Sequence, residues 1–87
     1  MNKYSVTILP KAIDELSKID KPMAKRITDK LAWFSKNIEV VELLPLRSEL
    51  SGLYKLKVGA YRVIYELDQS KRIVIVHKIG HRRDIYK

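Results

Sequence analysis

The sequence contains no cysteine, which excludes both disulfide bridges and a metal site built from thiolates. We therefore expect a reducing compartment, the cytoplasm. It also lacks a long hydrophobic run: the longest aliphatic stretch covers residues 73–76, whereas a membrane-spanning helix needs about 20 residues. Because the 87 residues include no repeat, low-complexity tract or linker, the whole chain, residues 1–87, is expected to form one domain.

Acidic residues are scarce in the second half of the chain. Residues 52–87 contain nine Lys or Arg and three Asp or Glu, whereas residues 1–51 contain nine and seven. The whole chain has a formal net charge of +8, most of it in the C-terminal part. This charge favours an anionic partner such as nucleic acid, an acidic protein or an anionic membrane surface, and composition does not choose among them.

The first part of the chain predicts a strand followed by two helices. Residues 4–9 are mostly β-branched or aromatic, and Pro10 then suits the start of a short helix. Asp20 is a good N-cap for a second helix with Pro22 in its first turn. The expected apolar stripes are Ile13, Leu16 and Ile19 for the first helix and Met23, Ile27, Leu31 and Phe34 for the second.

The second part predicts a sheet. Residues 37–51 contain Pro45 and no sustained period, so they are expected to be a connection in which a strand can start. Strands are predicted over residues 52–58, 60–67 and 71–79. The order β-α-α-β-β-β gives an α+β fold, in which a small, mainly antiparallel sheet packs on an N-terminal helical hairpin.

The stretch YKLKVGAYRVIYEL predicts a β-hairpin with the turn at Gly59-Ala60, because Gly suits the first central position of a type II′ turn. Lys57 then pairs with Arg62, and paired residues share a face. The predicted core face consists of Tyr54, Leu56, Val58, Tyr61, Val63, Tyr65 and Leu67, and the other face of Leu53, Lys55, Lys57, Arg62, Ile64 and Glu66. Since like charges opposed across strands are destabilising, the cations are either merely solvated or gathered to bind an anion.

The last predicted strand, RIVIVHKIG, is apolar at four successive positions, as in strands buried on both faces within a sheet. A two-residue turn at Gln69-Ser70 would place His77 opposite Arg62, and a shift of one residue would turn its side chain over. His77 is either a hydrogen-bonded structural residue or part of a site.

The chain ends in HRRDIYK. Arg binds phosphate through a planar fork and Tyr stacks on exposed bases. In combination with Lys55, Lys57 and Arg62, the three residues Arg82, Arg83 and Tyr86 therefore resemble an RNA-binding surface. The alternative is a basic, frayed terminus.

Three stretches carry a family resemblance: VTILPKAIDELSKIDKPMAKRI, LYKLKVGAYRVIYEL and IVIVHKIGHRRDIY. Their most specific parts are Lys-x-Lys followed by Gly-x-Tyr-Arg-x-x-Tyr, and the terminal Gly-His-Arg-Arg-x-x-Tyr. From end to end the chain resembles the RelE/ParE superfamily of toxins from type II toxin–antitoxin systems. The resemblance implies the α+β fold inferred above and, for the RelE branch, cleavage of messenger RNA in the ribosomal A site and a cognate antitoxin encoded alongside the toxin.

Carried over by motif, the resemblance implies catalytic roles for Lys55, Lys57, Arg62, Arg82 and Tyr86. Further candidates for RNA binding are Arg83, which can share or replace the role of Arg82, and the two histidines His77 and His81. There is no acidic cluster among the cations and no Cys/His ligand set, so we expect neither a two-metal nuclease nor a cofactor.

The expected chemistry is attack by the 2′-OH of the substrate on the adjacent phosphorus. The two arginines Arg62 and Arg82 would stabilise the phosphate charge, Tyr86 would stack on or orient a nucleotide, and Lys55 or Lys57 would take the 2′-OH proton. His81 is a second candidate proton carrier or a surface histidine. The sequence does not assign acid and base separately.

Two other functions stay open. The first is a ParE-like inhibitor of DNA gyrase without nuclease activity, and the second is a nucleic-acid-binding module without catalysis. In either toxin branch, an antitoxin is expected to cover the face of Lys55, Lys57 and Arg62 or to displace the RRDIYK tail. Base preference and the oligomeric state of the free toxin do not follow from the sequence.

Overall fold

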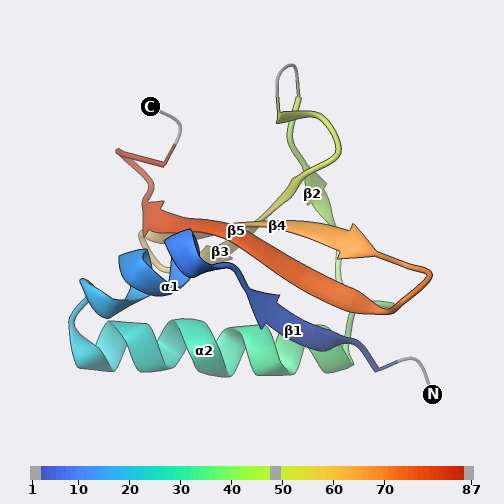
Figure 1. The fold of residues 1–87 in the computed structure, drawn as a ribbon, viewed down its shortest axis with the longest axis horizontal. Helices are drawn as coiled ribbons and strands as arrows, with labels where there is room; N and C mark the ends of the chain where they lie inside the picture. Colours follow the sequence, from blue (N-terminus) through green and yellow to red (C-terminus); the bar gives the residue numbers. More distant parts are fainter. Residues whose placement is uncertain (1–2, 48–49, 86–87) are drawn as a thin grey trace.

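The computed structural model describes residues 3–47 and 50–85. The elements are β1 (Ser5–Ile8), α1 (Pro10–Ser17), α2 (Lys21–Lys36), β2 (Leu44–Pro45), β3 (Tyr54–Val58), β4 (Tyr61–Asp68) and β5 (Ile73–His81). The sheet order is β1-β5-β4-β3-β2, and the β1–β5 pair alone is parallel. In Figure 1 the helices lie on one side of the sheet, and the loop after β2 and the C-terminal segment rise on the other. The α+β prediction is confirmed.

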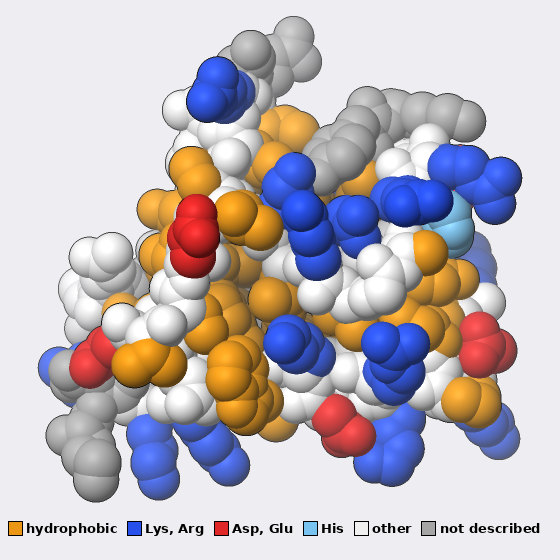
Figure 2. Space-filling model, turned by 180° about the vertical axis from the view of Figure 1, so that it is seen from behind, with side chains coloured by type: hydrophobic (Ala, Val, Ile, Leu, Met, Phe, Trp, Pro, Cys, Tyr) orange, Lys and Arg blue, Asp and Glu red, His pale blue; other side chains and the backbone are white. Residues whose placement is uncertain are grey.

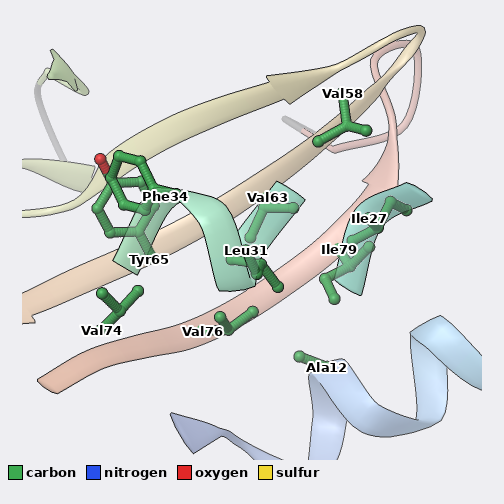
Figure 3. Packing of buried hydrophobic residues seen from close by; sticks show 10 residues of the cluster. All are labelled: Ala12, Ile27, Leu31, Phe34, Val58, Val63, Tyr65, Val74, Val76 and Ile79. Carbon is green, nitrogen blue, oxygen red and sulfur yellow. The ribbon is translucent and has the colours of Figure 1, made fainter. Parts of the chain in front are cut away.

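Helix α2 forms as predicted, whereas α1 turns a different side to the sheet. The Asp20 carboxylate accepts a hydrogen bond from the Met23 backbone N–H at 3.2 Å, which caps α2. In α1, Ile13 is 53% exposed and Ala12 is fully buried, so the predicted stripe through Ile13 is wrong. The small Ala12 side chain lets α1 approach β5 closely, as Figure 3 shows. The helix ends before Ile19, which therefore does not extend its stripe.

The core lies between α2 and the sheet. The ring of Phe34 meets that of Tyr65 edge to face at 5.0 Å, and Tyr54 stacks on Tyr65 at 5.6 Å. Figure 3 shows Phe34 and Leu31 of α2 facing Tyr65 and Val63 of β4. Burial, followed by the neighbouring Tyr54, raises the pKa of Tyr65, so its hydroxyl keeps its proton at alkaline pH values where an exposed tyrosine ionises.

The predicted β3–β4 hairpin is confirmed, including its register. Lys57 pairs with Arg62 and Val58 with Tyr61 across the turn. Gly59 has a φ of 59°, as the first central position of a type II′ turn requires. All seven residues predicted for the core face belong to the core cluster or pack against it.

The predictions for the last strand are partly wrong. The β4–β5 loop spans residues 69–72 and is not a two-residue turn. The Asp68 carboxylate holds the loop by accepting hydrogen bonds from the Ser70 hydroxyl at 2.8 Å and the Lys71 N–H at 3.0 Å. The bond from Lys71, and then that from Ser70, lowers the pKa of Asp68.

A β-bulge in β5 also changes the register. Ile64 pairs with Lys78 but Tyr65 pairs with Val76, which leaves His77 as the extra residue. Arg62 is therefore opposite Gly80, and the pairing of Arg62 with His77 that a two-residue turn would give does not occur. Burial along β5 alternates rather than covering both faces, because the helices pack against only one of them.

Within residues 3–47 and 50–85, none of the helices combines the length and the apolar character needed to span a bilayer.

Candidate nucleic-acid interface

Four basic residues lie on the sheet face that points away from the helices. We call this set the basic face: Lys55, Lys57, Arg62 and Lys78. Lys57 is directly opposite Arg62, while Lys55 and Lys78 flank the buried Ile64 on either side. Figure 2 shows Lys and Arg side chains in a band that reaches a histidine at one edge of the molecule. The sheet therefore gathers cations from β3, β4 and β5 on one surface.

Arg62 is oriented by the turn beside it. Its Nη1 donates hydrogen bonds to the carbonyl oxygens of Gly59 and Tyr61, both at 2.9 Å. A guanidinium has five N–H donors, so these two bonds leave donors available for an anion. Binding by two main-chain carbonyls fixes the guanidinium beside the turn, which reduces the entropy lost when a phosphate binds.

The C-terminal segment is attached to the same turn. The Arg82 backbone N–H donates to the Ala60 carbonyl at 2.8 Å, which brings Arg82 next to the β3–β4 turn. Ile85 is 3% exposed, and a Cβ at Gly80 would lie only 3.2 Å from its Cδ1. Lys78 Nζ donates to the Ile85 carbonyl at 2.9 Å, so residues 82–85 are packed onto the sheet and are not a frayed end.

The two histidines occupy different places. His77 Nε2 lies 2.9 Å from Glu66 Oε1, so His77 has a local carboxylate partner on the outer face. His81 pairs with Tyr61 at the end of the sheet, and the two rings meet edge to face at 5.5 Å. Because Tyr61 belongs to the core side of the hairpin, the pairing directs His81 to the face opposite Arg62.

A backbone hydrogen bond indicates which tautomer the neutral His81 ring adopts. Its Nδ1 accepts a hydrogen bond from the Arg83 backbone N–H at 3.1 Å. In the neutral ring the proton is then on Nε2, which makes His81 a donor through that nitrogen. The structure places the exposed Arg83 next to His81, and Tyr86 lies outside the described residues.

Two residues of this region were not predicted from the sequence. Lys78 was missed because simple alternation puts it on the face opposite His77, and only the bulge brings both to the outer face. Glu15 was missed because its partner is remote in sequence. Its Oε1 accepts the backbone N–H of Ile79 at 2.9 Å.

The Glu15 contact supports β5 where its neighbouring strand ends. β1 pairs with β5 from Ile73 to Val76 and goes no further. Beyond that point α1 lies against β5, and the Glu15 carboxylate serves as the acceptor that a longer β1 would have supplied. It thereby holds the end of β5 from which Arg82 and Arg83 follow.

The arrangement as a whole suits binding and stabilisation of a phosphate group. The basic face supplies ammonium and guanidinium donors, and Arg82 lies at the turn that orients Arg62. In the part of the chain that the structure describes, no three His, Cys, Asp or Glu side chains are grouped so that they could hold a metal ion.

Comparison with known proteins identifies the family. The sequence profile described as the ParE toxin of type II toxin-antitoxin system, parDE, matches residues 6–86. This chain belongs to that toxin family. The expected membership of the RelE/ParE superfamily is thus confirmed.

One curated relative of this toxin is Toxin RelG of Mycobacterium tuberculosis (strain ATCC 25618 / H37Rv). It is 40% identical over 43 residues, an alignment that covers 49% of each protein. The match therefore spans about half the length of this relative.

Solved structures of toxins extend the likeness to nearly the whole fold. The toxin-antitoxin complex RelBE2 from Mycobacterium tuberculosis matches with a TM-score of 0.85 and 27% identity, covering 97% of both chains. The intact E. coli RelBE toxin-antitoxin complex matches with a TM-score of 0.69 and 26% identity, covering 90% of this toxin and 95% of that chain.

Proposed function

We propose that this toxin cleaves messenger RNA and that the basic face, together with Arg82, binds the scissile phosphate. The observation that carries the proposal is the placement of three basic residues at one turn. Lys57 lies opposite Arg62, Arg62 is fixed on the carbonyls of Gly59 and Tyr61, and Arg82 is attached to Ala60. Relatives named RelE and RelG support this branch of the superfamily.

The proposed reaction uses the 2′-OH of the RNA as nucleophile. The 2′ oxygen forms a bond to the adjacent phosphorus, and the bond from phosphorus to the 5′ oxygen of the next nucleotide breaks. The products are a 2′,3′-cyclic phosphate and a 5′-OH end. One proton leaves the 2′-OH and one is given to the 5′ oxygen, so the reaction consumes no water.

Each cation has a proposed role in that reaction. Arg62 and Arg82 stabilise the negative charge that develops on the phosphate in the transition state. Lys55 or Lys57 takes the 2′-OH proton, and a second cationic group protonates the leaving oxygen. Tyr86, Arg83 and the two histidines His77 and His81 are proposed to bind or orient the nucleotides around the cleavage site. Of these, His81 faces the other side of the sheet and would contact a strand passing around its edge.

The proposed substrate is messenger RNA in the ribosomal A site, in the cytoplasm. A site that consists of cations without one strong dedicated base depends on substrate alignment, and orientation contributes several kcal/mol to such reactions. A ribosome supplies that alignment by holding the codon. We also propose a cognate antitoxin, since RelE-type relatives were solved as toxin-antitoxin complexes.

A second candidate function is inhibition of DNA gyrase. It is favoured by the family profile itself, which is described as ParE toxin and matches residues 6–86. In that case the cations would contact gyrase and would have no catalytic role.

The decisive experiment is to incubate antitoxin-free toxin with ribosomes translating a defined message and to map the 5′ ends. Naked message serves as the control. Cuts at the A-site codon that need ribosomes would support the proposal. Folded toxin that cuts neither sample but inhibits DNA supercoiling by gyrase would contradict the nuclease proposal and support the ParE-type function.

A matched pair of variants tests the site. Arg62→Ala or Arg82→Ala is expected to reduce cleavage by about 10² or more, because each removes a charge from the developing phosphate. Arg72→Ala, which removes an exposed arginine from the β4–β5 loop, should cleave like the wild type. Antitoxin binding is expected to stay nearly intact in Arg62→Ala and Arg82→Ala. Unchanged cleavage by both variants would remove the basic face from the mechanism.

A further inference from the structure

The C-terminal segment, residues 82–85, lies on the outer face of the sheet, beside Arg62. In Figure 1 the chain after β5 rises on the side of the sheet away from the helices. Gly80 is paired with Arg62 and shares its face, and a Cβ at Gly80 would lie only 3.2 Å from the Cδ1 of Ile85. Ile85 is 3% exposed, so its side chain packs on the sheet next to the proposed phosphate site.

Two contacts anchor the two ends of this segment. At its start, the Arg82 backbone N–H donates to the Ala60 carbonyl of the hairpin turn at 2.8 Å. At its end, the Lys78 ammonium donates to the Ile85 carbonyl at 2.9 Å. Between these contacts the chain turns, and the Ile85 backbone N–H donates to the His81 carbonyl at 3.0 Å. The exposed Arg82 side chain therefore belongs to a turn that is fixed at both ends.

The contact from Lys78 depends on one side chain, whereas the contact at Ala60 joins main-chain atoms. A hydrogen bond from a charged donor is stronger than one between neutral groups. Lys78 reaches this position because the bulge at His77 brings it to the outer face. Its ammonium has three donors, of which the bond to Ile85 occupies one. Lys78 thereby connects β5 to a carbonyl seven residues further along the chain.

An arginine near the end of a chain needs such support. The last residues of a domain are mobile unless other contacts anchor them. A mobile guanidinium loses conformational freedom when it binds a phosphate, whereas a guanidinium that is already oriented loses less. Arg62 is oriented by two carbonyls of the turn, and Arg82 is oriented through its segment. A displacement of about 1 Å at a reacting group can lower a rate by roughly 100-fold.

We propose that Lys78 is a positioning residue, whose ammonium holds residues 82–85 on the sheet and thereby places Arg82 beside Arg62. Lys78 then has a task within the basic face that is separate from direct binding of phosphate. The effect on cleavage rests on the proposed function, whereas the attachment of the segment is a property of the free toxin. Loss of the Lys78 ammonium is expected to release the end of the segment and, with it, the orientation of Arg82.

Amide hydrogen exchange of the free toxin tests the attachment without RNA. Lys78→Met removes the ammonium and keeps an unbranched side chain, so the Arg82 and Ile85 N–H groups are expected to exchange about 10-fold faster or more. Lys78→Arg retains a charged donor and should keep both amides within about 3-fold of wild type. The matched control Lys71→Met removes a lysine charge from the exposed β4–β5 loop and should keep both amides within about 2-fold.

Cleavage kinetics measure the consequence for Arg82. Lys78→Met is expected to lower kcat about 10-fold and to change KM by less than about 3-fold, because Arg82 stabilises charge that develops in the transition state. Lys78→Arg should restore most of kcat, and Lys71→Met should cleave like the wild type. Denaturation curves establish that each variant is folded at the assay temperature, so that a general loss of stability does not imitate this result.

A double-mutant cycle separates positioning from direct phosphate binding. Ile85→Ala loosens the same segment by removing its buried side chain from the sheet. If Lys78 acts through the segment, the double variant K78M/I85A should lose less activity than the product of the two single losses. Losses that multiply would show that Lys78 acts on the RNA independently of the segment, and they would overturn the inference.

Exchange and cleavage together separate this inference from the proposed function. Faster exchange at Ile85 with slower cleavage in Lys78→Met supports both. Slower cleavage with unchanged exchange would make Lys78 a direct phosphate ligand, and faster exchange with unchanged cleavage would show that Arg82 does not depend on it. Either result overturns the inference. If no form of the toxin cleaves RNA, the nuclease proposal falls, and exchange at Ile85 decides alone: faster exchange supports the attachment and unchanged exchange overturns it.

Discussion

The two faces of the β3–β4 hairpin differ in what their residues do. Val63 is fully buried against the helices, while its neighbour Arg62 points the other way and is fixed on two carbonyls of the turn. Core residues on one face hold the sheet on α2, and cations on the other lie close together at a cost that solvation or a bound anion offsets. The comparison indicates that stability and the proposed phosphate binding can be changed separately on one hairpin.

The largest expected effect is on the core face. Tyr65→Ala should lower the free energy of unfolding by about 4 kcal/mol, because it removes a buried ring packed on Phe34 and Tyr54. Lys57→Ala, on the exposed side of the same hairpin, should change it by less than about 0.5 kcal/mol. Chemical denaturation measures both. Equal losses would show that the two faces do not differ in this way.

A smaller loss is expected for the contact that supports β5. Glu15→Ala should cost about 2 kcal/mol, because the Ile79 N–H loses a charged acceptor in a partly buried position. Glu15→Gln retains an oxygen acceptor and should recover much of that stability. Denaturation and amide exchange at Ile79 are the measurements. Fast exchange of that amide in the wild type would contradict the assigned contact.

The turn should give an effect of about 1 kcal/mol. Gly59→Ala places a side chain at a φ of 59°, which is unfavourable for a residue with a Cβ. Since the turn carbonyls bind Arg62 and the Arg82 main chain, the proposed cleavage activity should fall with stability. Ala60→Gly serves as the control, because this position is not at positive φ. A fully active, fully stable Gly59→Ala would show that the turn does not organise the cations.

The smallest effect concerns pH and lies far from the basic face. The pKa of Asp68 is below its ordinary value in the folded protein, so its ionised carboxylate stabilises the fold at neutral pH. That contribution is fully present above the unfolded pKa, near about 4, and is lost as the pH falls through the folded value. Asp68→Ala should therefore lose less stability than the wild type as the pH falls below about 4. Identical acid unfolding curves would contradict this.

Much of the fold was predictable because its signals are local. The stripe through Ile27, Leu31 and Phe34, the cap at Asp20 and the turn at Gly59 each depend on residues a few positions apart. The hairpin register followed from the turn alone, and with it the pairing of Lys57 with Arg62. Local signals predicted the wrong buried side of α1, because packing against β5 buries Ala12 and leaves the more hydrophobic Ile13 exposed.

Three features follow from the amino-acid sequence alone: the family motifs, the C-terminal excess of positive charge, and the sorting of the hairpin into an apolar and a cationic face. Three other features depend on tertiary packing: the bulge at His77, the contact between Glu15 and Ile79, and the attachment of Arg82 to the turn. The two groups differ in the sequence separation of the residues that interact. Periodicity and turn chemistry act between neighbours along the chain, whereas register shifts and long-range contacts depend on how remote elements pack against one another.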